Sequence, residues 1–255
     1  IILEPIKKNT APAIITSALV NDIKSNQPIL FLPSDHYLPE KEKFNKILKS
    51  NLLNLSRKNI FIFGIKPIIP STDYGYLLSK KINIKISKVI KFIEKPNKSI
   101  AKKIINQKGC WNSGIVLARK DSIINNTKKI QKNLFNCCLN SITESKLKNG
   151  TVHLNKKYFS KIKAISFDHA ILEKAQEINS IQLNLIWSDL GSWKEIFKII
   201  KSKVTQDYIK KNTFYRPWGK YKNFFKGKNF LLKELTVNKK SSISLQKHHH
   251  RAEHW

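Results

Sequence analysis

The chain has 255 residues, 41% of them hydrophobic, which is enough for a packed core and argues against a disordered polypeptide. No apolar run approaches the roughly 18 to 20 residues that cross a bilayer, so the sequence predicts a soluble protein with no membrane partner. The formal net charge of +31 would attract polyanions. Only four of the 48 basic residues are arginines, however, and the lysines are dispersed, which argues against a nucleic-acid-binding protein.

The cysteines indicate the redox compartment. Cys110, Cys137 and Cys138 are an odd number without metal-binding spacing, and the adjacent pair would form only a strained disulfide. They therefore predict reduced thiols and a cytoplasmic location.

Apolar stretches bounded by turn residues alternate with helical periodicity, which predicts an α/β domain with a mostly parallel or mixed sheet. The expected strands are residues 28–33, 59–65, 88–93, 115–118 and 182–187. The expected helices are residues 43–55, 99–107, a lysine- and asparagine-rich stretch after residue 118, and residues 167–176 and 192–201.

The texture of the sequence changes near residue 214. A rigid turn at residues 215–219 and an alternating strand at 228–237 predict a small β module. We therefore expect a first domain over residues 1–200, a linker over 201–213 and a second module over 214–255.

Two aspartates follow predicted strands, where ligands bind in open α/β sheets. Asp35 follows the strand at 28–33 and Asp189 follows the strand at 182–187. Two carboxylates that converge there would hold one Mg²⁺ and leave coordination positions for phosphate oxygens. Each residue by itself is better explained as a turn or helix-capping aspartate.

Three further segments carry polar groups suited to a sugar phosphate. Glu94 ends a strand and would accept hydrogen bonds from hydroxyl groups, while Lys95 offers a charge to a phosphate, although such pairs are common on surfaces. Asn112 supplies a side-chain amide. Gly75 allows close approach of the backbone to a ligand.

In this order the motifs resemble bacterial mannose-1-phosphate guanylyltransferases, including the bifunctional form that carries a mannose-6-phosphate isomerase. The resemblance rests on residues 4–5, 9–13, 33–36, 74–76, 92–96, 111–114 and 187–193, and in the tail on residues 215–219 and 244–255. It implies a GT-A-like, Rossmann-related nucleotidyltransferase domain followed by the start of a cupin-type isomerase module. It also implies that GTP and mannose 1-phosphate react to GDP-mannose and pyrophosphate.

The resemblance also implies roles for single residues. Asp35 and Asp189 would hold Mg²⁺, and Lys95 would bind the sugar phosphate. Glu94, Asn112 and Gly75 would bind the sugar. Two more positions, Asn9 and Thr10, would lie near the nucleotide.

The tail contains a second candidate metal site. Gln246, His248 and Glu253 form a mixed nitrogen and oxygen set that suits Zn²⁺ or another divalent metal. A purification tag is the alternative explanation for the histidine cluster. The cupin family normally adds a later histidine ligand.

Three departures from the family pattern qualify the expectation. We expect a fragment that lacks the family's N-terminal Gly-rich loop and most of the C-terminal cupin. The region of residues 194–214 is several dozen residues shorter than usual, and Asp73 stands where the family commonly has glycine. The alternatives are a degenerate chain that binds a sugar nucleotide without catalysis, and a relative that uses another sugar 1-phosphate. Whether the chain forms a homo-oligomer stays open.

Overall fold

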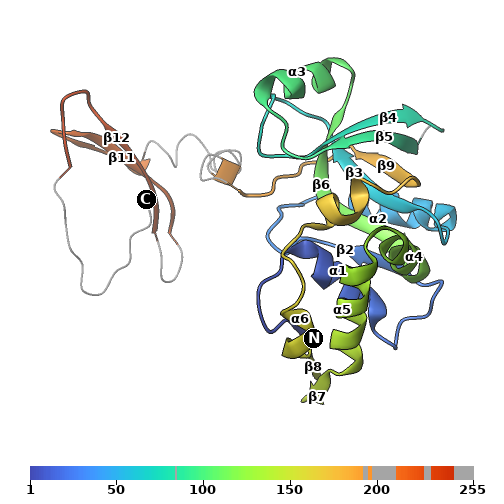
Figure 1. Ribbon diagram of the computed structural model, residues 1–255. Helices are drawn as coiled ribbons and strands as arrows, with labels where there is room; N and C mark the ends of the chain where they lie inside the picture. The colour runs from blue at the N-terminus through green and yellow to red at the C-terminus, as the bar shows by residue number, and fades with distance from the viewer. Residues whose placement is uncertain (84, 192–194, 197–210, 227–230, 244–255) are drawn as a thin grey trace. The chain divides into compact units, whose positions relative to one another are not determined.

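The computed structural model describes residues 1–83, 85–191, 195–196, 211–226 and 231–243 (Figure 1). The chain divides into two compact units, Ile1–Asp189 and Leu190–Trp255, called unit 1 and unit 2 below. No helix among the described residues is long and apolar enough to cross a membrane.

Unit 1 contains both strands and helices along its whole length. Its elements are β1 (Ile2–Leu3), α1 (Thr10–Leu19), β2 (Pro28–Phe31), α2 (Lys41–Asn51) with a 3-10 turn (Leu52–Asn54), β3 (Ile60–Ile65), β4 (Tyr76–Lys81), β5 (Ser87–Ile93), α3 (Lys98–Asn106), β6 (Cys110–Arg119), α4 (Lys120–Ile130), α5 (Lys132–Thr143), β7 (Lys146–Lys148), β8 (Thr151–His153), α6 (Lys156–Phe159), a π-helical turn (Asp168–Leu172) and β9 (Ile178–Leu183).

The central sheet has six strands in the order β2-β6-β3-β9-β5-β4, and the beginning of β6 also pairs with β4. β3 and β9 run parallel, while the other pairs in this sheet are antiparallel. The small strands β1, β8 and β7 form a separate sheet. The fold is therefore α/β with a mixed sheet, as the sequence predicts.

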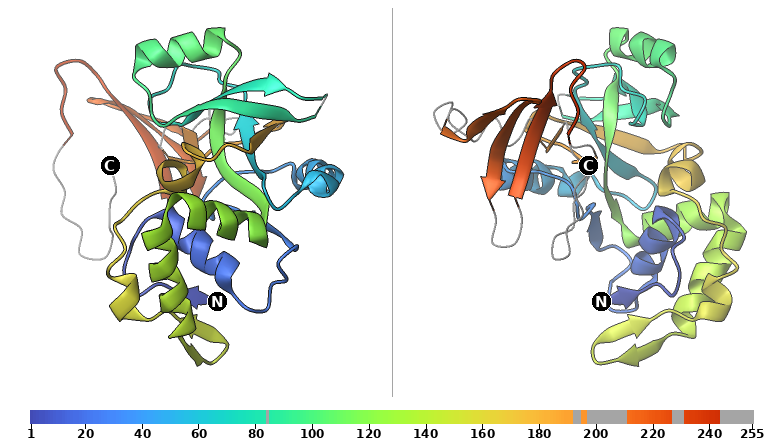
Figure 2. Two further views of the ribbon diagram at one scale, coloured as in Figure 1. Left: turned by 45° about the vertical axis from the view of Figure 1, so that its right-hand side comes forward. Right: turned by 90° about the vertical axis from the view of Figure 1, so that its left-hand side faces the viewer.

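Alternation along β3 builds two cores. Ile60 and Ile62 pack on one face of the sheet, and Phe61 and Phe63 pack on the other, all four fully buried. Helices α1, α4 and α5 supply the first core, and Figures 1 and 2 show them gathered on one side of the sheet. Helices α2 and α3 supply the second core. Both faces are thus covered, which explains the continuous apolar run of β3.

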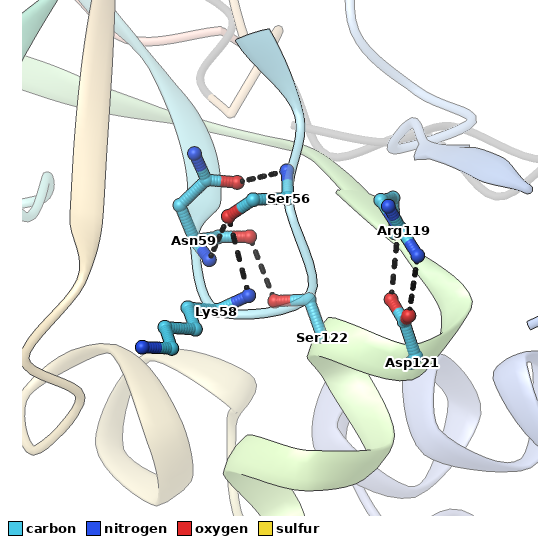
Figure 3. Close-up of polar contacts among 6 residues, drawn as sticks. All are labelled: Ser56, Lys58, Asn59, Arg119, Asp121 and Ser122. Atoms are coloured by element: carbon cyan, nitrogen blue, oxygen red, sulfur yellow. Dashed lines mark hydrogen bonds and ion pairs between the residues drawn. The ribbon is translucent and has the colours of Figure 1, made fainter. Parts of the chain in front are cut away.

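Polar contacts fix the start of β3 to the start of α4 (Figure 3). The buried Ser122 hydroxyl donates to the Asn59 carbonyl at 2.7 Å, and Asn59 Oδ1 accepts from the Ser56 backbone N–H at 2.8 Å. Arg119 donates two hydrogen bonds to Asp121, at 3.0 and 2.6 Å. The contacts of Ser122 and of Asn59 Oδ1 satisfy backbone groups just before β3, and the Arg119–Asp121 pair joins two side chains at the start of α4.

Several predicted elements differ from the structure. The strand expected at 182–187 is wrong: β9 covers Ile178–Leu183, and the apolar residues after it enter side-chain contacts rather than the sheet. The helix expected at 167–176 is reduced to the π-helical turn Asp168–Leu172. Helix α1 and strand β4 were not predicted. The helix expected at 192–201 lies outside the described residues, apart from 195–196.

Unit 2 contains an antiparallel sheet. Its strands are β10 (Thr213–Arg216), β11 (Gly219–Lys226) and β12 (Leu231–Val237), in that order. The predicted turn is present, with Pro217 and Trp218 between β10 and β11. Gly219 has a φ of +146° and lies so close to the Thr236 carbonyl that no Cβ would fit. These strands fit the start of a cupin-type module.

Candidate functional site

The strand register brings Gly75, Glu94 and Asn112 together. Tyr76, the first residue of β4, pairs with the last residue of β5 and with Trp111 of β6. The preceding residue Gly75 therefore lies between Glu94 and Asn112. The Asn112 backbone N–H donates to the Gly75 carbonyl at 2.7 Å.

The absence of a side chain at Gly75 makes room for the carboxylate. A Cβ there would lie 2.6 Å from Glu94 Oε2, 3.2 Å from Phe92 Cζ and 3.6 Å from Asn112 Cβ. Real Cβ contacts are essentially never below 3.0 Å. Gly75 thus allows the half-buried Glu94 carboxylate to lie beside the start of β6.

Asp168 joins this group from a distant part of the chain. The Asn112 Nδ2 amide donates to Asp168 Oδ1 at 2.7 Å. The Phe167 N–H donates to Thr10 Oγ1 at 3.0 Å, which ties the segment that bears Asp168 to the start of α1. We call Gly75, Glu94, Asn112 and Asp168 the carboxylate–amide cluster.

Burial dominates the electrostatics of this cluster. It raises the pKa of Glu94, and the charge of Asp168 raises it further, while Lys95 and His169 oppose the shift. Burial also raises the pKa of Asp168, more than hydrogen bonds from its own backbone and from Asn112 lower it. The Glu173 carboxylate, 3.0 Å from His169 Nδ1, raises the pKa of that histidine.

A second group forms around Asp35 and Asp189. Tyr37 and Ser188 exchange two backbone hydrogen bonds, of 2.8 and 3.1 Å, which join the loop after β2 to the segment after β9. Asp35 lies in the exposed turn just before this bridge, and Asp189 directly follows it. Both carboxylates act on His36: burial lowers the pKa of His36, and the two charges oppose this. The bridge therefore brings both aspartates near His36, although Asp189 lies six residues beyond β9 rather than directly after a strand.

Aromatic side chains line this second group. The Tyr74 hydroxyl donates to Asp189 Oδ1 at 2.9 Å, and the Tyr74 ring lies 4.6 Å from the Trp111 ring. Trp187 Nε1 donates to His36 Nδ1 at 3.3 Å. Asp35, His36, Tyr74, Trp187 and Asp189 are called the aspartate–aromatic cluster. Tyr74 directly precedes Gly75, and the Trp111 ring that Tyr74 contacts directly precedes Asn112. The two clusters are therefore neighbours.

The other predicted residues are placed as follows. Lys95 is exposed, with a φ of +41°, and its charge reaches Glu94. Asn9 caps α1 with its side chain on the Thr10 N–H at 2.8 Å. Thr10 contacts the segment of Asp168 as described above, whereas Asn9 has no contact with either cluster among the interactions found in the described residues. The candidate cupin ligands Gln246, His248 and Glu253 lie outside the described residues.

Sequence reasoning missed Asp168 and Tyr74 as members of the site. The sequence marks Asp168 only as a carboxylate near a helix start, and it lies 56 positions from Asn112. No local motif signals such a contact. Tyr74 stands out only as a neighbour of Gly75.

The donor set at Asp35 and Asp189 is suited to Mg²⁺. No group of three or more His, Cys, Asp or Glu side chains that would hold a metal occurs in the part of the chain that the structure describes. Mg²⁺ is commonly bound by one or two carboxylates, with water and substrate phosphates completing the shell. Asp35 and Asp189, both near His36, are two carboxylates of this kind.

Comparisons with known proteins identify the family of the chain. The family model described as nucleotidyl transferase matches residues 1–206, and the one described as mannose-6-phosphate isomerase C-terminal matches residues 203–255. A mannose-1-phosphate guanylyltransferase of Salmonella montevideo is 27% identical and aligns with all of this chain and 69% of its own length. The xanthan biosynthesis protein XanB of Xanthomonas campestris pv. campestris is also 27% identical, over all of this chain and 68% of its own.

Solved structures share the fold. A mannose-6-phosphate isomerase from Helicobacter pylori aligns with a TM-score of 0.66 at 24% identity, over 73% of each chain. A mannose-1-phosphate geranyltransferase from Thermus thermophilus aligns with a TM-score of 0.69 at 22% identity, over 81% of this chain and 58% of that one. This chain thus spans 58% of the Thermus protein's length. Because the matching family model covers residues 1–206, the chain belongs to the nucleotidyl transferase family, whose members are transferases.

Proposed function

We propose that the chain is a nucleotidyltransferase of the mannose-1-phosphate guanylyltransferase type, which forms GDP-mannose and pyrophosphate from GTP and mannose 1-phosphate. The observation that carries the proposal is the contiguity of two clusters. One offers carboxylates and an amide to hydroxyl groups, and its neighbour offers two aspartates to a metal and its phosphates. The name of the Salmonella montevideo relative, mannose-1-phosphate guanylyltransferase, supports the choice of sugar and base.

The carboxylate–amide cluster would bind the sugar. The Glu94 carboxylate accepts hydrogen bonds from hydroxyl groups, and the Asn112 amide has both a donor and an acceptor. Gly75 leaves room for the Glu94 carboxylate, so that this carboxylate and the backbone of Gly75 would both face the sugar ring. Lys95, next to Glu94, would direct its positive charge to the phosphate on the anomeric carbon.

Asp35 and Asp189 would hold Mg²⁺, which would neutralise negative charge on the nucleotide phosphates. In the reaction an oxygen of the sugar phosphate attacks the α-phosphorus of GTP, and the bond from that phosphorus to the bridging oxygen breaks. The electron pair leaves with pyrophosphate. Tyr74 would orient the Asp189 carboxylate through its 2.9 Å hydrogen bond.

Pyrophosphate release from GTP and mannose 1-phosphate, with and without Mg²⁺, tests the proposal. We expect release that requires both substrates and the metal. Asp35→Asn and Asp189→Asn should abolish it while the melting temperature stays near that of wild type. Asp22→Asn, at an exposed loop aspartate outside both clusters, is the matched control and should retain full activity.

Other results would separate the alternatives. Full activity in both cluster variants would overturn the metal assignment. No release from folded protein that still binds GDP-mannose in a calorimetric titration would favour a degenerate sugar-nucleotide-binding chain. Faster reaction with glucose 1-phosphate than with mannose 1-phosphate would favour a different sugar.

The match of residues 203–255 supports a further proposal for the second module. Gln246, His248 and Glu253 would bind Zn²⁺ or another divalent metal. Titration of the whole chain with Zn²⁺ should give binding that His248→Ala weakens. Equal binding by that variant would contradict this ligand set.

A further inference from the structure

Asp168 occupies an unusual position for an ionisable side chain. It is the first residue of the π-helical turn and is half-buried, and this burial raises the pKa of its carboxyl group. A buried carboxylate is costly unless its hydrogen bonds compensate for lost water. Its side-chain partner is the Asn112 amide, at 2.7 Å.

The Asn112 side chain is consequently held at both ends. Nδ2 donates to Asp168, and Oδ1 lies 3.3 Å from the Gly114 N–H, which donates to it. The Gly114 contact is long, whereas the Asp168 contact is short and its acceptor is ionisable, so Asp168 contributes more to the orientation. Because a carboxylate only accepts, it also determines which end of the amide is the nitrogen.

This contact leaves the second Nδ2 hydrogen of Asn112 available to another acceptor. Glu94, on the other side of Gly75, accepts hydrogen bonds in its charged form. A ligand that meets both groups must accept from the amide and donate to the carboxylate. Hydroxyl groups do both, whereas an ionised phosphate oxygen carries no hydrogen and only accepts.

We propose that Asp168 is a positioning residue of the sugar site, which acts by fixing the Asn112 side-chain amide so that its nitrogen faces a sugar hydroxyl. The inference rests on the proposed function and extends it to a residue outside the motifs. Asp168 itself need not touch the sugar.

A double-mutant cycle tests the inference, with calorimetric titration of the whole chain by mannose 1-phosphate. Loss of a hydrogen bond to a charged group corresponds to about a 10- to 100-fold change in affinity. We expect Asp168→Ala to weaken binding by about this factor. In the Asn112→Ala background the same change should have almost no further effect, because its target is gone.

Two more variants exclude a general structural effect. Asp168→Asn keeps an oxygen acceptor and should recover most of the affinity. Lys174→Ala, at an exposed residue just after the same turn, is the matched control and should bind as wild type. Melting temperatures of all variants are measured in parallel.

Three results would overturn the inference. Equal weakening by Asp168→Ala in both backgrounds would mean that Asp168 does not act through Asn112. Wild-type affinity of Asp168→Ala would mean that the contact is irrelevant to binding. Failure of the wild-type chain to bind mannose 1-phosphate and GDP-mannose would overturn the proposed function and this inference with it.

Discussion

Gly75→Ala should separate ligand binding from stability. Gly75 is not in a left-handed conformation, so its backbone accepts alanine without strain. Alanine at such a position stabilises a protein by about 0.4–1 kcal/mol, because the unfolded chain loses freedom. The new Cβ would meet Glu94 Oε2 at 2.6 Å, at the far end of a flexible side chain. The carboxylate can withdraw, and we expect the fold to persist.

The magnitude of the binding loss follows from that withdrawal. An ordinary contact begins at 3.4 Å, so the carboxylate oxygen must move by about 0.8 Å. A hydrogen bond of about 2.8 Å to a sugar hydroxyl would then lengthen to about 3.6 Å, beyond hydrogen-bonding distance. Loss of a bond to a charged acceptor weakens binding by about 1.5–3 kcal/mol, which is about 10- to 100-fold.

The assay is calorimetric titration with mannose 1-phosphate, with melting temperature measured on the same samples. Gly150→Ala is the matched control. Gly150 lies in the turn between β7 and β8, and a Cβ there would meet nothing within 4 Å, but its φ is +72°. That variant should lose about 1–2 kcal/mol of stability and keep its affinity.

Gly75→Ala should therefore lose affinity and keep its stability, whereas Gly150→Ala should lose stability and keep its affinity. Wild-type affinity in Gly75→Ala would refute the position of Glu94 in the sugar site. A large drop in its melting temperature would refute the argument that the Glu94 side chain yields easily.

Three further predictions concern stability and charge. Asp168→Asn should raise the melting temperature at neutral pH, because burial raises the pKa of Asp168 and ionisation of this carboxyl group therefore opposes folding. The gain should shrink as the pH falls from the raised pKa to the ordinary carboxyl pKa and vanish below it, and an unchanged melting temperature at neutral pH would contradict this. Ser122→Ala should leave the Asn59 carbonyl without its 2.7 Å donor and lower the free energy of unfolding by about 1–3 kcal/mol in a urea titration. A change near zero would mean that another donor replaces the hydroxyl. Glu173→Gln should lower the pKa of His169 in an NMR titration, since Glu173 is the main cause of the upward shift of that pKa. The His169–Glu173 pair contributes stability below the ordinary histidine pKa, and this contribution is lost as the pH rises through the raised pKa of His169.

The elements that the sequence predicted well are those whose local pattern has one explanation. The β3 run is apolar on both faces and bounded by turns, so its strand is found within a residue. Residues 185–187 show the opposite case. Their apolar pattern resembles a strand, yet they lie beyond the end of β9, and Trp187 donates a hydrogen bond to His36. Hydrophobicity alone does not distinguish these two uses.

The site residues also differ in how far a local pattern in the sequence identifies them. Gly75, Glu94 and Asn112 were predicted as separate motifs, and their meeting depends on the pairing of Tyr76 with strands on both sides, which periodicity does not specify. Asp168 requires one more long-range step, because its segment is fixed by Thr10 at the start of the chain. A residue that acts by orienting another leaves no motif of its own. Its contribution is visible only in the contact with Asn112, and a coupling measurement between these two positions is therefore more informative than substitution of either one.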